Sequence, residues 1–191
     1  VDGRYRGTDL AVHRAEDYTR YSVFSLWDTY RAAHPLFTIL ERERTNDFIR
    51  TFLAQYEEGG KLPMWELAGN YTGCMIGYHA VPVITDAYGK GIRDYDAELA
   101  LEAMVSTALA DELGKRPYAE FGFIPAEEEH ESVSKTLEYA YDDWCIAQMA
   151  RSLEEDVIYE TFLKRAQSYQ NLFDPETHLM RARSHQRWWT P

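Results

Sequence analysis

The stretch Ser132-Val-Ser-Lys-Thr-Leu-Glu-Tyr-Ala-Tyr-Asp-Asp-Trp-Cys-Ile-Ala-Gln148 decides the fold class of this 191-residue chain. Five of its side chains recur at intervals of three or four residues, at Val133, Leu137, Tyr141, Trp144 and Gln148. This spacing places them on one face of a helix. Ser132 or Ser134 can cap the first turn. The stretch therefore predicts a long amphipathic helix.

The same periodicity extends on both sides of this helix. Further helices are predicted over residues 24–40 with a break at Pro35, 45–59, 72–91 with Pro82 inside, 94–114 and 154–173. Residues 61–67 are expected to be short and extended, and residues 115–129 to form a long loop. About six helices with short extended segments predict an all-α fold. Their apolar faces on two sides favour concentric layers over a simple bundle.

Composition and charge narrow the function classes. The formal net charge is −12, and the Lys and Arg residues are scattered, so nucleic acid is not expected as a partner. No apolar run approaches the roughly 18 residues that would span a bilayer. The first residues, Val-Asp-Gly-Arg, include neither an initiator Met nor the apolar core of a signal peptide, so we expect a piece of a longer protein.

Three clusters combine a tryptophan with a carboxylate: Trp27-Asp28, Trp65-Glu66 and Asp142-Asp143-Trp144. The last follows the acidic run 127–131. A flat apolar ring beside a hydrogen-bonding carboxylate suits a sugar, which has an apolar C–H face and a rim of hydroxyls. Carbohydrate is therefore the leading ligand class.

Each candidate also has a structural interpretation. Asp28 lies among aromatic and apolar neighbours, where an unpaired charge is costly, so its partner is Arg31, another helix end or a ligand. Glu66 is either a functional residue on a turn or a cap of the following helix. Trp27 and Trp65 are either core residues or sugar platforms. The sequence leaves these alternatives open.

Other catalytic motifs are absent from the sequence. His130-Glu131 begins like a zinc-protease helix, but position 134 is Ser instead of the second His. Asp142 and Asp143 are adjacent on a helix and point about 100° apart, which argues against a shared cation site. The chain has no phosphate-binding loop, no dinucleotide fingerprint and no Gly-x-Ser-x-Gly elbow.

Several longer strings resemble one family. They are residues 21–31 (Tyr-Ser-Val-Phe-Ser-Leu-Trp-Asp-Thr-Tyr-Arg), 62–67 (Leu-Pro-Met-Trp-Glu-Leu), 77–79 (Gly-Tyr-His), 86–91 (Asp-Ala-Tyr-Gly-Lys-Gly) and 132–144. In this order they resemble the catalytic domain of glycoside hydrolase family 92, the exo-acting α-mannosidases. The similarity covers essentially all of residues 1–191.

The resemblance implies a calcium-dependent, inverting α-mannosidase, often specific for α-1,2 linkages, that acts on mannose-containing glycans and is periplasmic or secreted. It implies an (α/α)6 toroid behind a β-sandwich, with calcium at the sugar between them. It carries Asp28 over as a ligand of the terminal mannose, with Trp27 beside it, and Trp65 and Glu66 as a neighbouring part of the cleft.

The strings that hold the family's catalytic carboxylates do not occur in this chain. The resemblance places the acid in a Glu-Gly-Asn string downstream of residues 188–191, and the base in a later acidic string. The calcium ligands also fall largely outside. We therefore expect residues 1–191 to be about half of the toroid, without the β-sandwich and the C-terminal part. This piece is expected to hold no catalytic residue and no metal ligand, to bind no calcium, and to be inactive alone.

Two further expectations follow. Helices that bury a face against absent polypeptide would expose apolar surface, so self-association is expected. The alternatives are a non-catalytic helical carbohydrate-binding or scaffold module, and another (α/α)6 glycosidase whose acid is Glu66 or a residue of the run 127–131.

Overall fold

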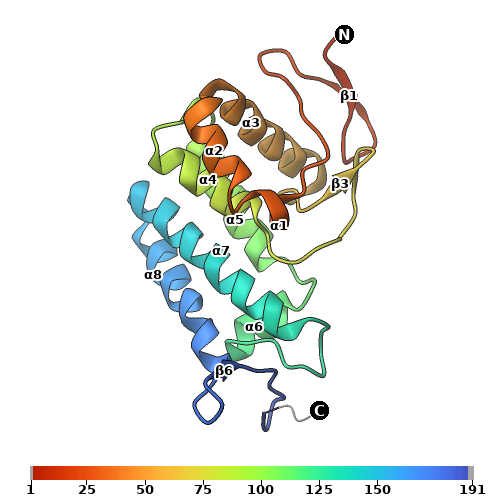
Figure 1. Cartoon of the computed structure of the whole chain (residues 1–191). Coiled ribbons are helices and arrows are strands. Elements are labelled where there is room, and N and C mark those ends of the chain that lie inside the picture. The colour runs from red at the N-terminus through yellow and green to blue at the C-terminus, as the bar shows by residue number, and fades with distance from the viewer. Residues whose placement is uncertain (1, 189–191) are drawn as a thin grey trace. The chain divides into compact units, whose positions relative to one another are not determined.

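The computed structural model describes residues 2–188 and divides the chain into two compact units, Val1–Thr107 and Ala108–Pro191. Most of the chain is helical, as predicted, and Figure 1 shows the helices in order along it. The strands are short and pair as three antiparallel hairpins. Residues 189–191 of the tail lie outside the described residues.

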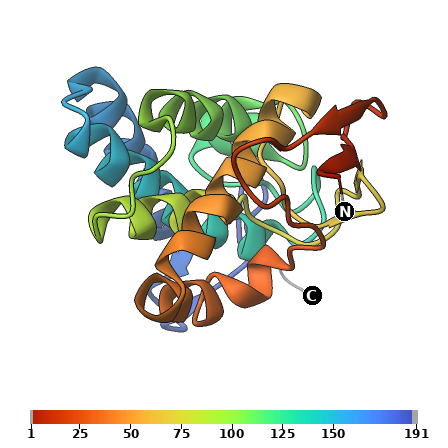
Figure 2. The ribbon, with the colours of Figure 1, turned by 90° about the horizontal axis from the view of Figure 1, so that it is seen from above.

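The first unit combines helices with two hairpins. Its elements are β1 (Arg4–Arg6), β2 (Val12–Arg14), α1 (Leu26–Thr29), α2 (Ala33–Leu40), α3 (Arg42–Gly59), β3 (Glu66–Leu67), β4 (Asn70–Tyr71), α4 (Ala80–Gly89) and α5 (Ala97–Leu109). In the hairpins, Tyr5 pairs with His13 and Glu66 with Tyr71. Helix α3 packs against α2 and α4, and Figure 2 shows the β1–β2 hairpin near the end of α3.

Helix α3 forms the centre of this unit because its apolar residues repeat on one face. Phe48, Ile49 and Phe52 are buried there, and the rings of Phe48 and Phe52 meet the Phe24 ring edge to face, with centroids 5.7 and 4.8 Å away. Gly60, in the left-handed conformation at φ 77°, ends the helix as predicted. The predicted start at residue 45 was three residues late.

Two boundaries differ from prediction because of proline. The stretch 24–40 forms two short helices, with the break at residues 30–32, and Pro35 lies in the first turn of α2. The helix predicted from residue 72 begins only at Ala80, so Pro82 lies in its first turn and kinks nothing. The first turn of a helix tolerates proline because its N–H groups have no partner within the helix.

The second unit is built on a helical hairpin. Its elements are α6 (Lys115–Phe121), α7 (Ser132–Ser152), α8 (Asp156–Arg165), the 3-10 helix η1 (Ala166–Leu172), β5 (Phe173–Asp174) and β6 (Leu179–Met180). Helix α7 packs against α8 and η1, because a three-residue connection folds α8 back along α7 (Figure 1).

The long loop predicted over 115–129 was wrong in its first half, where α6 forms. Gly114 and Gly122 flank α6, both with positive φ, and Pro117 lies in its first turn. These residues suggested a loop, but they also suit the two ends of a short helix. Within residues 2–188 no helix is long and apolar enough to cross a membrane.

Candidate functional site

The segment before α1 and inside it carries the first predicted cluster. Phe24 and Leu26 are buried and anchor the segment, whereas Asp28 is exposed to solvent. The Ser25 hydroxyl donates a hydrogen bond to Asp28 Oδ2 at 2.5 Å. The expectation that Asp28 lies in an apolar environment was therefore wrong. In the four-residue helix α1, Leu26 is buried, Trp27 and Thr29 are half-buried and Asp28 is exposed.

The second predicted cluster lies against the first. The Trp65 indole N–H donates a hydrogen bond to Ser25 Oγ at 3.1 Å. Ser25 thus links Trp65 to Asp28. Trp65 and Trp27 are both half-buried, and the Arg31 guanidinium lies 5.3 Å from the Trp27 ring centroid. The structure therefore brings Asp28 and Trp65 together around one serine, and Trp27 precedes Asp28 in the same short helix.

Glu66, the fourth predicted residue, is buried in β3 instead of capping a helix. Its Oε1 accepts a hydrogen bond from the Phe24 backbone N–H at 3.2 Å, while Oε2 has no partner among residues 2–188. Burial raises the pKa of Glu66, and the nearby N–H groups and the Gln55 side chain offset only part of this effect. A carboxyl group in this environment takes up a proton more readily than an exposed one.

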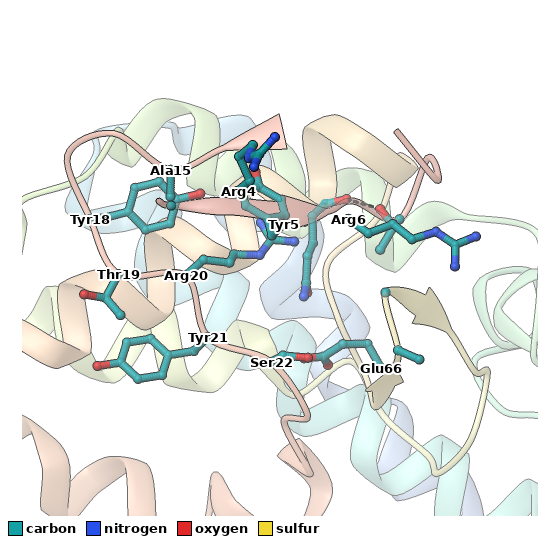
Figure 3. Close-up of a pocket in the computed structure, with 15 residues that line it drawn as sticks. Arg4, Tyr5, Arg6, Ala15, Tyr18, Thr19, Arg20, Tyr21, Ser22 and Glu66 are labelled. Atoms are coloured by element: carbon teal, nitrogen blue, oxygen red, sulfur yellow. Dashed lines mark hydrogen bonds between the residues drawn. The ribbon is translucent and has the colours of Figure 1, made fainter. Parts of the chain in front are cut away.

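Glu66 lines a cavity of about 570 Å³ in the first unit. Figure 3 shows Arg4, Tyr5 and Arg6 of the hairpin above this cavity and Glu66 below it. Further lining residues come from the extended segment 18–22 and from α3, and they include Tyr18, Arg20, Tyr21 and Gln55. Trp27, Asp28 and Trp65 do not line it. The cavity and the surface around Asp28 are therefore distinct features.

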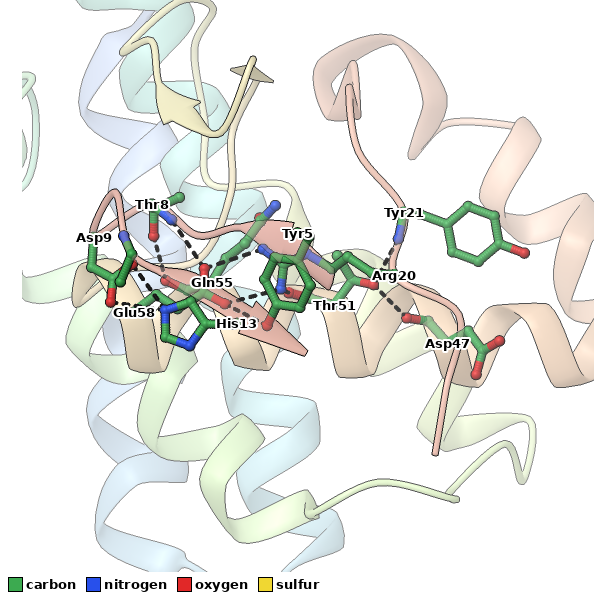
Figure 4. A network of polar contacts seen from close by, with 11 residues as sticks. Tyr5, Thr8, Asp9, His13, Arg20, Tyr21, Asp47, Thr51, Gln55 and Glu58 are labelled. Carbon is green, nitrogen blue, oxygen red and sulfur yellow. Dashed lines mark hydrogen bonds and ion pairs between the residues drawn. The ribbon is translucent and has the colours of Figure 1, made fainter. Parts of the chain in front are cut away.

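A polar network holds the hairpin above the cavity (Figure 4). Glu58 of α3 accepts hydrogen bonds from the Tyr5 hydroxyl at 2.8 Å and the Thr8 N–H at 3.0 Å, and pairs with Arg20 at 3.2 Å. The Arg20 guanidinium also lies 4.1 Å from the Tyr5 ring centroid. Burial and the bond to Glu58 raise the pKa of Tyr5, so its hydroxyl stays protonated as a donor.

Sequence reasoning missed this network and the cavity. Tyr5 and Glu58 are 53 residues apart, and no local pattern marks their contact. The sequence feature that could have indicated the cavity is the high density of aromatic residues in the segment with Tyr18, Tyr21 and Phe24.

The third predicted cluster, in the second unit, has a structural role. Asp143 is fully buried, pairs with Arg165 Nε at 2.9 Å and accepts a hydrogen bond from the Tyr118 hydroxyl at 3.0 Å. Trp144 is half-exposed on the neighbouring face of α7 and stacks on Tyr141, with the ring planes 16° apart. Both carboxylate oxygens of Asp143 thus have protein partners.

Three glutamates of the acidic run 127–131, Glu127, Glu128 and Glu129, make protein contacts. Glu129 pairs with Lys135 at 2.8 Å, and Glu128 contacts the His185 ring nitrogen. The described part of the chain holds no group of three or more His, Cys, Asp or Glu side chains placed to bind a metal ion.

The chain is similar to a known protein family and to solved structures. The family model described as the glycosyl hydrolase family 92 catalytic domain matches residues 1–191. The GH92 α-mannosidase BT3965 of Bacteroides thetaiotaomicron, solved in complex with mannoimidazole, is 49% identical, with a TM-score of 0.96, over 100% of this chain and 26% of that one.

Two further relatives are more distant. The GH92 inverting mannosidase BT2199 of the same bacterium is 36% identical, with a TM-score of 0.91, over 98% of this chain and 26% of that one. A protein of Arthroderma benhamiae named as an uncharacterized secreted glycosidase is 29% identical over 161 residues, which are 75% of this chain and 20% of that protein. The chain thus spans about a quarter or less of these relatives. The matches and the helical fold confirm the predicted fold class, part of an α/α toroid.

Proposed function

The chain belongs to glycoside hydrolase family 92, and on this premise we propose that it forms part of an inverting exo-α-mannosidase that removes terminal α-1,2-linked mannose from glycans. Two structural relatives named as mannosidases, one of them as inverting, support this activity. The relative named as secreted supports an exported protein, periplasmic or secreted.

One observation supports the position of the sugar: the hydrogen-bonded series Trp65, Ser25, Asp28. An exposed carboxylate accepts hydrogen bonds from sugar hydroxyls, and half-buried indole rings beside it offer apolar faces to the sugar C–H groups. In this proposal Asp28 binds hydroxyls of the terminal mannose, and Trp27 and Trp65 form the wall beside it. Ser25 fixes the carboxylate oxygen that is not engaged by sugar.

The catalytic carboxylates are proposed to belong to other parts of the protein. Inversion requires one carboxylic acid to protonate the leaving oxygen and one carboxylate to activate water, about 6.5–9.5 Å apart. Since residues 1–191 span about a quarter of the mannosidases they match, we propose that the longer protein supplies both groups, the β-sandwich and the calcium ligands. Residues 1–191 would then position the sugar without hydrolysing it.

The test is substitution of Asp28 in the longer protein. A hydrogen bond to a charged group contributes about 1.5–3 kcal/mol, so Asp28→Asn is expected to lower kcat/KM on α-1,2-mannobiose by about one to two orders of magnitude. Asp17→Asn, which changes another exposed aspartate of the same unit, is the matched control. Equal losses in both variants, or no loss in Asp28→Asn, would refute the proposed sugar position.

A second candidate rests on the burial of Glu66 and its raised pKa, which are properties of a general acid. In that case the 191-residue chain would itself hydrolyse an aryl α-mannoside, and Glu66→Gln would abolish this turnover. No turnover by the chain, together with turnover by the longer protein, supports the first proposal over the second.

A further inference from the structure

The cavity beneath the β1–β2 hairpin contains two polar atoms that lack partners. Gln55, on α3, is 4% exposed, and Glu66, on β3, is 2% exposed; both line the cavity. Gln55 Oε1 and Glu66 Oε2 have no hydrogen-bond partner among residues 2–188. A buried polar atom without a partner costs about 1–3 kcal/mol. Each of these two lining residues thus keeps one oxygen that no described protein group satisfies, which indicates a site that is completed by donors from a ligand.

The walls of this cavity are preformed. The network of Glu58 with Tyr5 and Arg20 fixes the hairpin to α3. On the other side, Gly69 approaches the same hairpin so closely that an added Cβ would lie 3.0 Å from the Arg6 carbonyl oxygen. Its φ of +71° also favours glycine. A cavity held from two sides retains its shape without a ligand.

Size and charge define the ligand class. A volume of about 570 Å³ lies within the range of about 300–1,000 Å³ that is typical of small-molecule sites. Three arginines line the cavity: Arg20 pairs with Glu58 (Nη2–Oε2 3.2 Å), Arg4 pairs with Asp2 (Nε–Oδ2 2.6 Å), and Arg6 is exposed to solvent. The groups without partners accept hydrogen bonds. They therefore favour a neutral ligand with several hydroxyl donors over an anion.

We propose that this cavity is a sugar-binding site separate from Asp28, in which Gln55 Oε1 and Glu66 Oε2 accept hydrogen bonds from two hydroxyls of a mannose-containing saccharide. The choice of mannose rests on the proposed function, whereas the requirement for a neutral polyhydroxylated ligand rests on the cavity alone. Asp28 binds the terminal residue in this scheme, and the cavity holds a second sugar ring.

The experiment separates the two sites by working in an Asp28→Ala background of the longer protein. Methyl α-D-mannoside is titrated calorimetrically into Asp28→Ala, and the remaining binding reports the cavity. Adding Gln55→Leu is expected to weaken this binding at least tenfold. Adding Gln167→Leu, an exposed glutamine of the second unit, is expected to leave it within twofold. Circular dichroism melts confirm that each variant is folded.

A crystal of the wild-type protein soaked in the same sugar provides a measurement that needs no variant. Sugar density within hydrogen-bond distance of Gln55 and Glu66 is expected. A cavity filled by water alone or by a segment of the protein's own chain would overturn the proposal, as would a Gln55→Leu effect below twofold. If the protein hydrolyses α-mannosides but the cavity stays empty, only this inference fails. If sugar occupies the cavity but no mannosidase activity is found, only the proposed function fails.

Discussion

The indole nitrogen of Trp65 donates its hydrogen bond to the hydroxyl of Ser25, 40 residues earlier in the chain, at 3.1 Å. Through this contact two separate tryptophan–carboxylate motifs become one surface, because Ser25 donates in turn to Asp28. Ser25 is therefore the residue that connects Trp65 to Asp28.

Removing the Ser25 hydroxyl tests its role as a positioning residue. A neutral hydrogen bond contributes about 0.5–1.5 kcal/mol net, so Ser25→Ala is expected to lower kcat/KM of the longer protein up to about tenfold, chiefly through KM. Ser25→Thr, which keeps the hydroxyl, is expected to restore most of it. Ser152→Ala is the control, since that exposed hydroxyl donates a hydrogen bond to the Gln148 carbonyl of its own helix. Equal activity of Ser25→Ala and wild type would contradict the prediction.

Buried His34 predicts an acid-sensitive stability. It is 4% exposed among the rings of Phe24, Phe37, Phe48 and Phe52, and burial lowers its pKa from the usual 6.5 to about 4. The unfolded chain therefore takes up this proton first as pH falls. The stability is fully present above about pH 6.5, falls by about 3 kcal/mol towards pH 4, and then levels off.

The measurement is the free energy of unfolding in urea at pH 7.5 and pH 4, compared with His34→Leu. The variant lacks this titrating group, so the difference between the two proteins is expected to change with pH by about 3 kcal/mol. A difference that stays constant across this range would show that His34 is not responsible.

The Asp143–Arg165 pair predicts a purely structural effect in the second unit. Asp143 is fully buried, and removing one partner of a buried ion pair leaves an uncompensated charge, at a cost of about 3–5 kcal/mol. Asp143→Ala is expected to lower the free energy of unfolding by this amount. Asp111→Ala, which breaks the exposed pair with Arg116, is expected to cost at most about 1 kcal/mol. Similar effects of both variants in urea unfolding would contradict the assignment.

The outer face of α2 predicts the behaviour of the chain alone. Leu36, Ile39 and Leu40 are 50%, 70% and 67% exposed. We propose that this apolar patch drives self-association of the 191-residue chain. Light scattering at high concentration is expected to show oligomers of the wild type and a monomer after Leu36→Glu with Ile39→Lys. Val157→Lys, at an exposed valine of α8, is expected to change nothing. A monomeric wild type would refute this proposal.

Local patterns predicted the helices well where apolar spacing was regular. The helix after residue 131 forms as predicted, but its predicted apolar face was wrong: Tyr141 and Trp144 are exposed, whereas Tyr139, Ile146 and Met149 are buried. The predicted ends of helices were wrong near several glycine and proline residues. Pro35, Pro82 and Pro117 all lie in first turns, where the missing N–H costs nothing.

The candidate site was predicted only in part. The sequence selected Trp27, Asp28, Trp65 and Glu66 by residue type and by their resemblance to a family, and it could not distinguish their environments. Glu66 is buried. Asp28 is exposed, although its aromatic and apolar neighbours in sequence predicted an apolar environment.

Sequence alone determined the helical class, the family and the residue types available for a sugar, because each of these is written in short strings and local spacing. Tertiary structure decided which carboxylate faces solvent, which is paired with Arg165, and where Gln55 and Glu66 meet. The bond from Phe24 to Glu66 spans 42 residues and the bond from Arg165 to Asp143 spans 22. Such contacts depend on how helices and hairpins pack, and burial, charge pairing and pKa follow from that packing.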